Sequence, residues 1–150
     1  MGASPNTNAA GKVYLDQVAG EKNYLQGGLL SEDASTGIGY ASGSGGTVTQ
    51  LVSDGTNVEL NKICGQVITY PLTLAAGEDT NFFVNNSTVE VGDVVAVSVQ
   101  HYTGASDSIP VASVVESTTG SFKLNVRNVG AVTLNALTKI NFAVIKAVSA

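Results

Sequence analysis

Hydrophobic and polar residues alternate along the second part of this chain, in short stretches separated by turn residues. Alternation with a period of two places apolar side chains on one face of a β-strand and polar side chains on the other. The pattern predicts about eight strands within residues 47–150. They are expected at 47–51, 57–60, 66–70, 80–84, 94–102, 109–117, 122–128 and 139–146.

The clearest alternation lies in the two strands nearest the C-terminus. There we expect six side chains to face a core, namely Phe122, Leu124, Val126, Ile140, Phe142 and Val144. The run 94–102 is apolar on both faces, which is typical of a central strand. Pro110 favours an edge position for the strand that follows it, because proline cannot donate a backbone hydrogen bond.

The segments between the strands carry turn chemistry. Asp54-Gly55 predicts a hairpin between the first two strands, because glycine accepts the positive φ of tight hairpin turns. Residues 72–79 are expected to form a loop with apolar anchors. Residues 131–137 are expected to hold at most a single helical turn.

Residues 1–46 do not share the strand pattern and end in the glycine-rich stretch Gly43-Ser44-Gly45-Gly46, which we interpret as a hinge or an extended crossing segment. Ordering an extended arm costs about 1–2 kcal/mol per residue of backbone entropy. Isolated apolar residues in such an arm therefore predict a partner that buries them. The expected anchors are Val13, Tyr14, Leu15, Tyr24, Leu25, Leu29, Leu30, Ile38 and Tyr40.

Composition agrees with a β protein. The chain is 43% hydrophobic and only 13% charged, and it contains 17 glycines. Few charges and abundant valine are typical of strands with a neutral polar surface. We therefore expect an all-β fold. It would be an antiparallel β-sandwich or jelly-roll-like domain of about eight strands over 47–150, behind an extended N-terminal arm over 1–46.

Charge and the length of apolar runs argue against two classes of partner, nucleic acids and membranes. A net charge of -5 with seven scattered cations, of which Arg127 is the only arginine, lacks the basic patch that nucleic-acid binding requires. No apolar run approaches membrane-spanning length, so we expect no membrane partner. Met1–Asn6 has no apolar stretch typical of a signal peptide, which favours assembly inside a cell.

The chain offers little catalytic chemistry. His101 is the only histidine and Cys64 the only cysteine, and we expect a strand-end histidine and a small buried thiol. Serine is plentiful, which leaves a Ser-His-Asp arrangement open, but no nucleophile-elbow motif supports one. Glu78, Asp79, Glu90 and Asp93 flank turns and are expected to be solvated. We predict no catalytic, metal or cofactor site.

Several short motifs resemble a recurrent module of tailed-bacteriophage virion proteins. They are Gly37-Ile38-Gly39-Tyr40, Gly45-Gly46-Thr47-Val48-Thr49-Gln50, Leu60-Asn61-Lys62, Gly65-Gln66-Val67-Ile68-Thr69, Leu74-Ala75-Ala76-Gly77, Phe82 to Ser87, Gly120-Ser121-Phe122 and Asn141-Phe142-Ala143-Val144-Ile145-Lys146. The similarity covers about two-thirds of the chain and leaves out residues 1–36. The resemblance implies a head-decoration or cement protein on the capsid surface of a virion, with homotrimeric assembly and the major capsid protein as partner. It brings no catalytic residues.

A competing hypothesis is a fibre or spike domain that binds a glycan or receptor on a host surface. Its contacts would come from the loops 72–79, 85–93 and 103–108. The chain contains no tryptophan, and aromatic residues are scarce near these loops, which counts against sugar stacking.

Overall fold

The computed structural model describes residues 6–7, 13–14, 38–40 and 42–147. The chain divides into two units, Met1–Gly39 and Tyr40–Ala150. In the first unit, β1 (Asn6–Thr7) pairs antiparallel with β2 (Val13–Tyr14), a short ladder in a stretch where the sequence pattern predicts no strands. The described part of the second unit is all-β and contains no helix.

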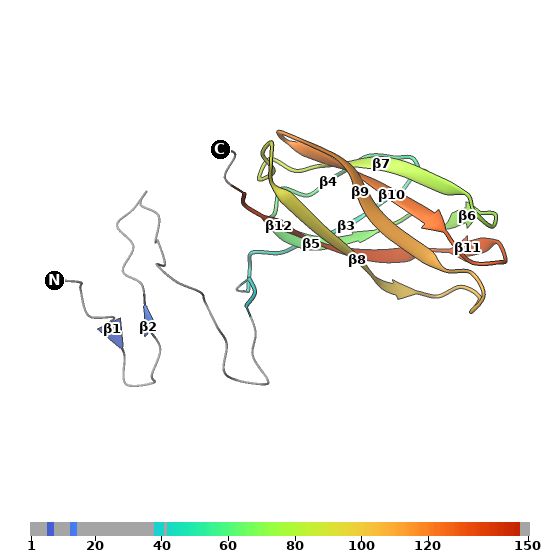
Figure 1. The fold of residues 1–150 in the computed structure, drawn as a ribbon, viewed down its shortest axis with the longest axis horizontal. Helices are drawn as coiled ribbons and strands as arrows, with labels where there is room; N and C mark the ends of the chain where they lie inside the picture. The colour runs from blue at the N-terminus through green and yellow to red at the C-terminus, as the bar shows by residue number, and fades with distance from the viewer. Residues whose placement is uncertain (1–5, 8–12, 15–37, 41, 148–150) are drawn as a thin grey trace. The chain divides into compact units, whose positions relative to one another are not determined.

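Ten strands, β3 to β12, build the second unit (Figure 1). One four-stranded sheet has the order β4 (Val58–Glu59), β7 (Asp79–Asn85), β10 (Ser121–Asn128), β9 (Pro110–Thr118). The other has the order β3 (Thr47–Thr49), β5 (Cys64–Ile68), β12 (Thr138–Ile145), β8 (Val94–Tyr102). A two-stranded ladder joins β11 (Leu134–Ala136) to β6 (Leu72–Leu74).

The two larger sheets share one hydrophobic core. All six side chains expected to face inward from β10 and β12 are buried, so that prediction is confirmed. The rings of Phe122 and Phe142 meet between the sheets, with centroids 5.2 Å apart and a tilt of 56°. Tilted rings at this separation are a favourable aromatic arrangement. Val67, Leu72, Phe82 and Leu134 complete the centre of the core from four other strands.

The sheets are mixed rather than purely antiparallel, which corrects the expected pairing. β3 runs parallel to β5, and β4 runs parallel to β7. The expected hairpin at Asp54-Gly55 is also wrong, because β3 and β4 belong to different sheets. A turn does form there, closed by the N–H of Thr56 donating to the Ser53 carbonyl at 3.1 Å, but Gly55 does not have a positive φ. The turn therefore carries the chain from one sheet to the other.

The prediction of a central strand over 94–102 is wrong, because β8 lies at the edge of its sheet. Its side chains do alternate: Val95, Val97 and Val99 are half-buried, while the opposite face is exposed. The expected edge position of the strand after Pro110 is confirmed in β9. Two segments read as loop and helical turn instead form β6 and β11, whose leucines are buried.

A tight turn joins β9 to β10. Thr119 and Gly120 form a two-residue loop, and Gly120 has a φ of 86°, which glycine adopts without steric cost. This hairpin brings β9 beside β10, with a register shift between Lys123 and Leu124.

Candidate interaction surfaces

The arm residues proposed as anchors are only partly described. Leu15, Tyr24, Leu25, Leu29 and Leu30 lie outside the described residues. Val13 and Tyr14 form β2, where Val13 pairs with Thr7 and Tyr14 with Asn6. Ile38 is 71% exposed, and Tyr40 is exposed while its hydroxyl donates to the Val144 carbonyl. Burial of the arm by a partner therefore stays a prediction.

The glycine-rich stretch before β3 makes hydrogen bonds to the strands beside it. The Gly46 carbonyl accepts from the N–H of Gln66 at 2.9 Å, and the Gly43 carbonyl accepts from Lys62 Nζ at 3.3 Å. Tyr40, before this stretch, adds its bond to β12. The glycine-rich stretch itself is thus attached to the domain at two points, Gly43 and Gly46.

The most exposed large apolar side chains of the second unit stand next to one another after β3. Leu51 is 78% exposed and Val52 is 76% exposed. We call this pair the apolar knob. Exposed single apolar residues are common on protein surfaces, but two consecutive ones at the tip of a fixed loop are a typical contact element.

Gln50 fixes the loop that carries the apolar knob. Its side chain is buried, and Nε2 donates to the carbonyls of Asp54 at 3.0 Å and Thr56 at 2.6 Å. Its Oε1 accepts from the N–H of Tyr70 at 3.0 Å. The Ser53 and Thr56 hydroxyls lie 2.9 Å apart and add a second closure. The loop is therefore ordered before any partner binds.

The outer faces of the two larger sheets differ in charge. The outward-facing strand residues of the β4-β7-β10-β9 sheet include five charged ones, Glu59, Asp79, Glu116, Lys123 and Arg127. Here Asn125 donates to Asp79 at 2.6 Å, and Lys123 lies over the Phe83 ring at 5.5 Å. This face is a mixed-charge surface, which is typical of a solvent-exposed sheet face.

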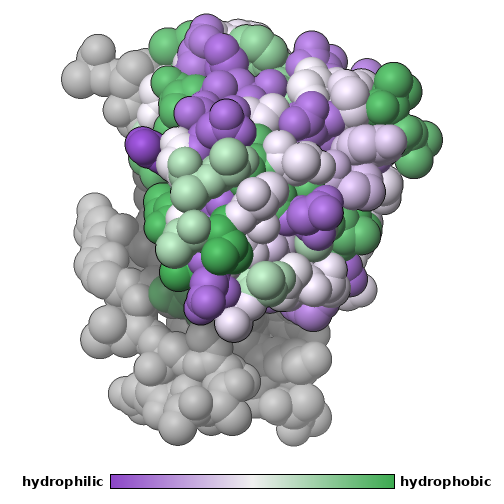
Figure 2. Space-filling view, turned by 90° about the vertical axis from the view of Figure 1, so that its right-hand side faces the viewer, coloured by the Kyte–Doolittle hydropathy of each residue, from purple (hydrophilic) through white to green (hydrophobic). Residues whose placement is uncertain are grey.

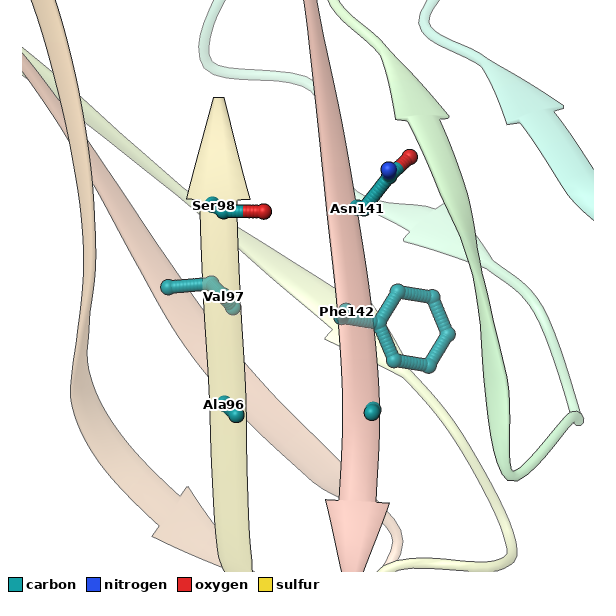
Figure 3. Close-up of a pocket in the computed structure, with 6 residues that line it drawn as sticks. Ala96, Val97, Ser98, Asn141 and Phe142 are labelled. Atoms are coloured by element: carbon teal, nitrogen blue, oxygen red, sulfur yellow. The ribbon is translucent and has the colours of Figure 1, made fainter. Parts of the chain in front are cut away.

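The outer face of the β3-β5-β12-β8 sheet is nearly free of charge. Among its described outward-facing strand residues, the basic ones are Lys139 and His101, which stand opposite each other, and none is acidic. A shallow hollow of about 250 Å³ lies on β8 and β12, next to Ala96, Ser98 and Asn141 (Figure 3).

Figure 2 shows an end of the domain, where apolar groups stand in small clusters between polar ones.

A buried carboxylate holds the end of β12. Asp93 was expected to be solvated, and that prediction is wrong: its side chain is 1% exposed, and Lys146 Nζ lies 2.7 Å from Oδ2. The hydrogen bond from Lys146, followed by that from the Glu90 N–H, holds the pKa of Asp93 below its ordinary value. The same bond to Asp93 raises the pKa of Lys146.

The residues considered for chemistry are not assembled into a site. His101 is exposed and stands opposite Lys139, and Cys64 is half-buried at the start of β5. Glu78 is exposed, and its carboxylate accepts from the N–H of Ala75 at 2.9 Å. Within the described residues, no three metal-ligating side chains lie together.

Sequence reasoning missed the apolar knob and the Asp93 contacts. Leu51 ends the stretch 47–51 that was expected to form a strand, so nothing in the sequence marks Leu51 and Val52 as part of a loop. Asp93 looks like any acid after a glycine, and its partner Lys146 is 53 residues away. Both features depend on contacts that only the folded chain creates.

Comparisons with protein-family models, curated proteins and solved structures found no match for this chain. Among the described residues, no helix is both long and apolar enough to span a membrane.

Proposed function

We propose that this chain is a structural virion protein that decorates and cements the capsid of a tailed bacteriophage. It would bind major capsid subunits and neighbouring copies of itself, as a homotrimer on the capsid surface. In this proposal the two-sheet domain is the sandwich or jelly-roll-like domain of such proteins, and residues 1–39 belong to the attachment arm.

The apolar knob is the observation that best supports an attachment role. Leu51 and Val52 are the most exposed large apolar side chains of the described second unit, on a loop that Gln50 holds in place. A pre-ordered contact loop loses little conformational entropy on binding, so more of its contact energy appears as affinity. Burying such a side chain contributes on the order of 1.5–3 kcal/mol.

The arm supplies a second attachment through its sequence. Its apolar anchors, spaced over residues 13–38, fit a segment that orders against another protein. A chain that is held at the knob and at the arm binds with a high effective concentration for the second contact. Repetition of the capsid lattice would multiply this effect.

Capsids that lack the decoration protein provide the test. Purified full-length chain is added to them, and occupancy is measured by co-sedimentation and electron microscopy. Leu51→Ser/Val52→Ser is compared with Val129→Ser/Val132→Ser, a matched pair of exposed valines in the loop between β10 and β11. We expect the knob variant to lower occupancy at least tenfold and the control to leave it unchanged.

A third variant, Tyr24→Ser/Leu25→Ser/Leu29→Ser/Leu30→Ser, tests the arm in the same assay. Undiminished occupancy of both the knob and the arm variants would overturn the proposed attachment.

A glycan array with the full-length chain addresses the fibre or spike alternative. Saturable binding to one class of glycan, with no binding to capsids, would favour host recognition instead.

A further inference from the structure

We propose that the outer face of the β3-β5-β12-β8 sheet is the surface through which one copy of this chain contacts another. We call it the neutral face. It consists of the outward-facing residues Thr47, Thr49, Cys64, Gln66, Ile68, Val94, Ala96, Ser98, Gln100, His101, Lys139, Asn141, Ala143 and Ile145. The inference rests on the self-association included in the proposed function and concerns a pairwise contact between copies; because one face meets the same face of a second copy, this contact is two-fold and distinct from the three-fold contact of a homotrimer.

Charge is the reason for choosing a second copy as the occupant. Each chain carries a net charge of -5, so two copies repel each other wherever acidic residues meet. The β4-β7-β10-β9 face carries three acids, Glu59, Asp79 and Glu116. The neutral face carries none. Two copies can therefore approach through the neutral face without bringing carboxylates together.

The composition of the neutral face also fits a protein contact. Interface centres are depleted in charged residues compared with the remaining surface. Val94 and Ile145 stand opposite each other in the β8–β12 ladder and are each 54% exposed, so they leave an apolar cross-strand pair in water. The amide of Gln66 bonds that of Asn141 at 3.0 Å, which orders the polar row beside them. The charged cluster of Glu90, Asp93 and Lys146 lies at the margin, where Lys146 is paired with both carboxylates.

The shape of the face allows close contact. Ala143 stands opposite both Ala96 and Cys64, so three small residues form one row across the sheet. Ala96 and Ala143, with Ser98 and Asn141, border the hollow of about 250 Å³, where the strands of Figure 3 lie side by side. A side chain from the second copy can enter this hollow. The absence of acidic residues favours this face, and the hollow can receive a side chain of the second copy.

Two serines provide a matched test. Ser98 lies exposed on edge strand β8 in the neutral face, and Ser113 lies exposed on edge strand β9 in the charged face. Ser98→Glu would bury a carboxylate in an uncharged contact, which is costly. The association of full-length wild-type, Ser98→Glu and Ser113→Glu chains is measured by sedimentation equilibrium, and circular dichroism checks that each variant is folded.

We expect the wild-type chain to associate, Ser98→Glu to weaken association at least tenfold, and Ser113→Glu to leave it unchanged. Equal effects of the two variants, or a wild-type chain that stays monomeric at all concentrations, would overturn the inference. Capsid binding by a chain that is monomeric in solution would leave the proposed decoration role intact. Self-association that depends on Ser98, without capsid binding, would support the inference and overturn the proposed decoration role.

Cys64 supplies a second measurement that needs no substitution. It is the only cysteine and lies in the neutral face, so thiol-reactive reagents report on that face alone. We expect its reaction rate to fall several-fold as the wild-type concentration rises through the association range. A constant rate while the chain associates would place the contact elsewhere and overturn the inference.

Discussion

Asp93 and Lys146 join the turn before β8 to the end of β12. Lys146 Nζ lies 2.7 Å from Oδ2 of Asp93, and the other carboxylate oxygen accepts from the N–H of Ala147 at 3.2 Å. The N–H of Glu90 donates to the same carboxylate at 2.9 Å. Three groups from two segments therefore bond to one side chain, and removing it leaves the end of β12 without these bonds.

The charge of Asp93 makes the stability of the domain depend on pH. Its pKa is lowered in the folded chain, mainly by the hydrogen bond from Lys146, so its contribution is complete above its ordinary pKa of 3.8. The contribution is lost as the pH falls through the lowered value. Because the pKa of Lys146 is raised, its contribution is lost only as the pH rises above its ordinary 10.5.

We therefore expect Asp93→Asn to be less stable than wild type at pH 5–8, by an amount that does not vary within that interval. Below about pH 4 the difference should shrink, because the wild-type carboxylate also becomes neutral. Urea unfolding at a series of pH values measures both chains. Glu90→Gln, which changes an exposed partner of Lys146, is the control. A difference that stays constant down to pH 2 would contradict the assigned role.

Asn128 connects more of the domain than any pattern in the sequence suggests. The side chain is fully buried, and Nδ2 donates to the carbonyls of Leu74, Ala75 and Val132 at 3.0, 3.2 and 2.8 Å. Oδ1 accepts from the N–H groups of Ile109 and Gly130. The amide thereby holds together the ends of β6, β9 and β10 and the loop before β11.

Asn128→Ala is expected to destabilise the domain by about 2–4 kcal/mol, since buried carbonyls and N–H groups would lose their partner. Asn125→Ala on the same strand is the control, because that amide is exposed, and we expect a loss below about 1 kcal/mol. Chemical unfolding of both variants gives the two free energies. Equal losses would mean that burial of the Asn128 bonds has little energetic effect.

The alternation in β10 and β12 was sufficient to predict which side chains form the core. Phe122, Leu124 and Val126 belong to one local period, and burial of one strand face requires only that period. Strand partners are a different matter. The edge position of β8 and the parallel pairs of β3 and β4 depend on which distant segment lies beside each strand. A single strand does not carry that information.

Short segments were predicted least well, for a related reason. Three residues of β6 and three of β11 are too few to display a period, and their pairing rests on the burial of Leu72, Leu74 and Leu134. The apolar knob was hidden in the same way. Leu51 was expected to end the strand 47–51, yet the strand ends at Thr49 and the side chain of Gln50 bonds to the loop that follows.

Gly130 is expected to tolerate no side chain. A Cβ there would meet the backbone N of Ile109 and Cα of Ser108 at 2.7 Å each, and would also strike the Asp107 carbonyl oxygen. Backbone atoms on three consecutive residues have little room to move. Gly130→Ala should destabilise the domain by about 1–3 kcal/mol through overpacking.

Gly55 is the matched control for Gly130, because a Cβ there meets no atom within 4 Å and its φ is not positive. We expect Gly55→Ala to be neutral or to stabilise by up to about 1 kcal/mol, by restricting the unfolded chain. Thermal unfolding of the two variants compares them directly. A loss in Gly55→Ala as large as that in Gly130→Ala would show that the close approach at Gly130 is not the cause.

Gln50→Ala tests whether the order of the loop, and not only its apolar surface, serves binding. The substitution removes the acceptor of the Tyr70 N–H and the donor to the carbonyls of Asp54 and Thr56, while Leu51 and Val52 stay unchanged. We expect faster hydrogen exchange at the Tyr70 amide, a stability loss of about 1–3 kcal/mol, and weaker capsid binding. Gln66→Ala, an amide on the neutral face, is the control for the exchange measurement and should leave the Tyr70 amide protected. Unchanged capsid occupancy by a Gln50→Ala chain whose Tyr70 amide exchanges faster would mean that the knob binds equally well from a disordered loop.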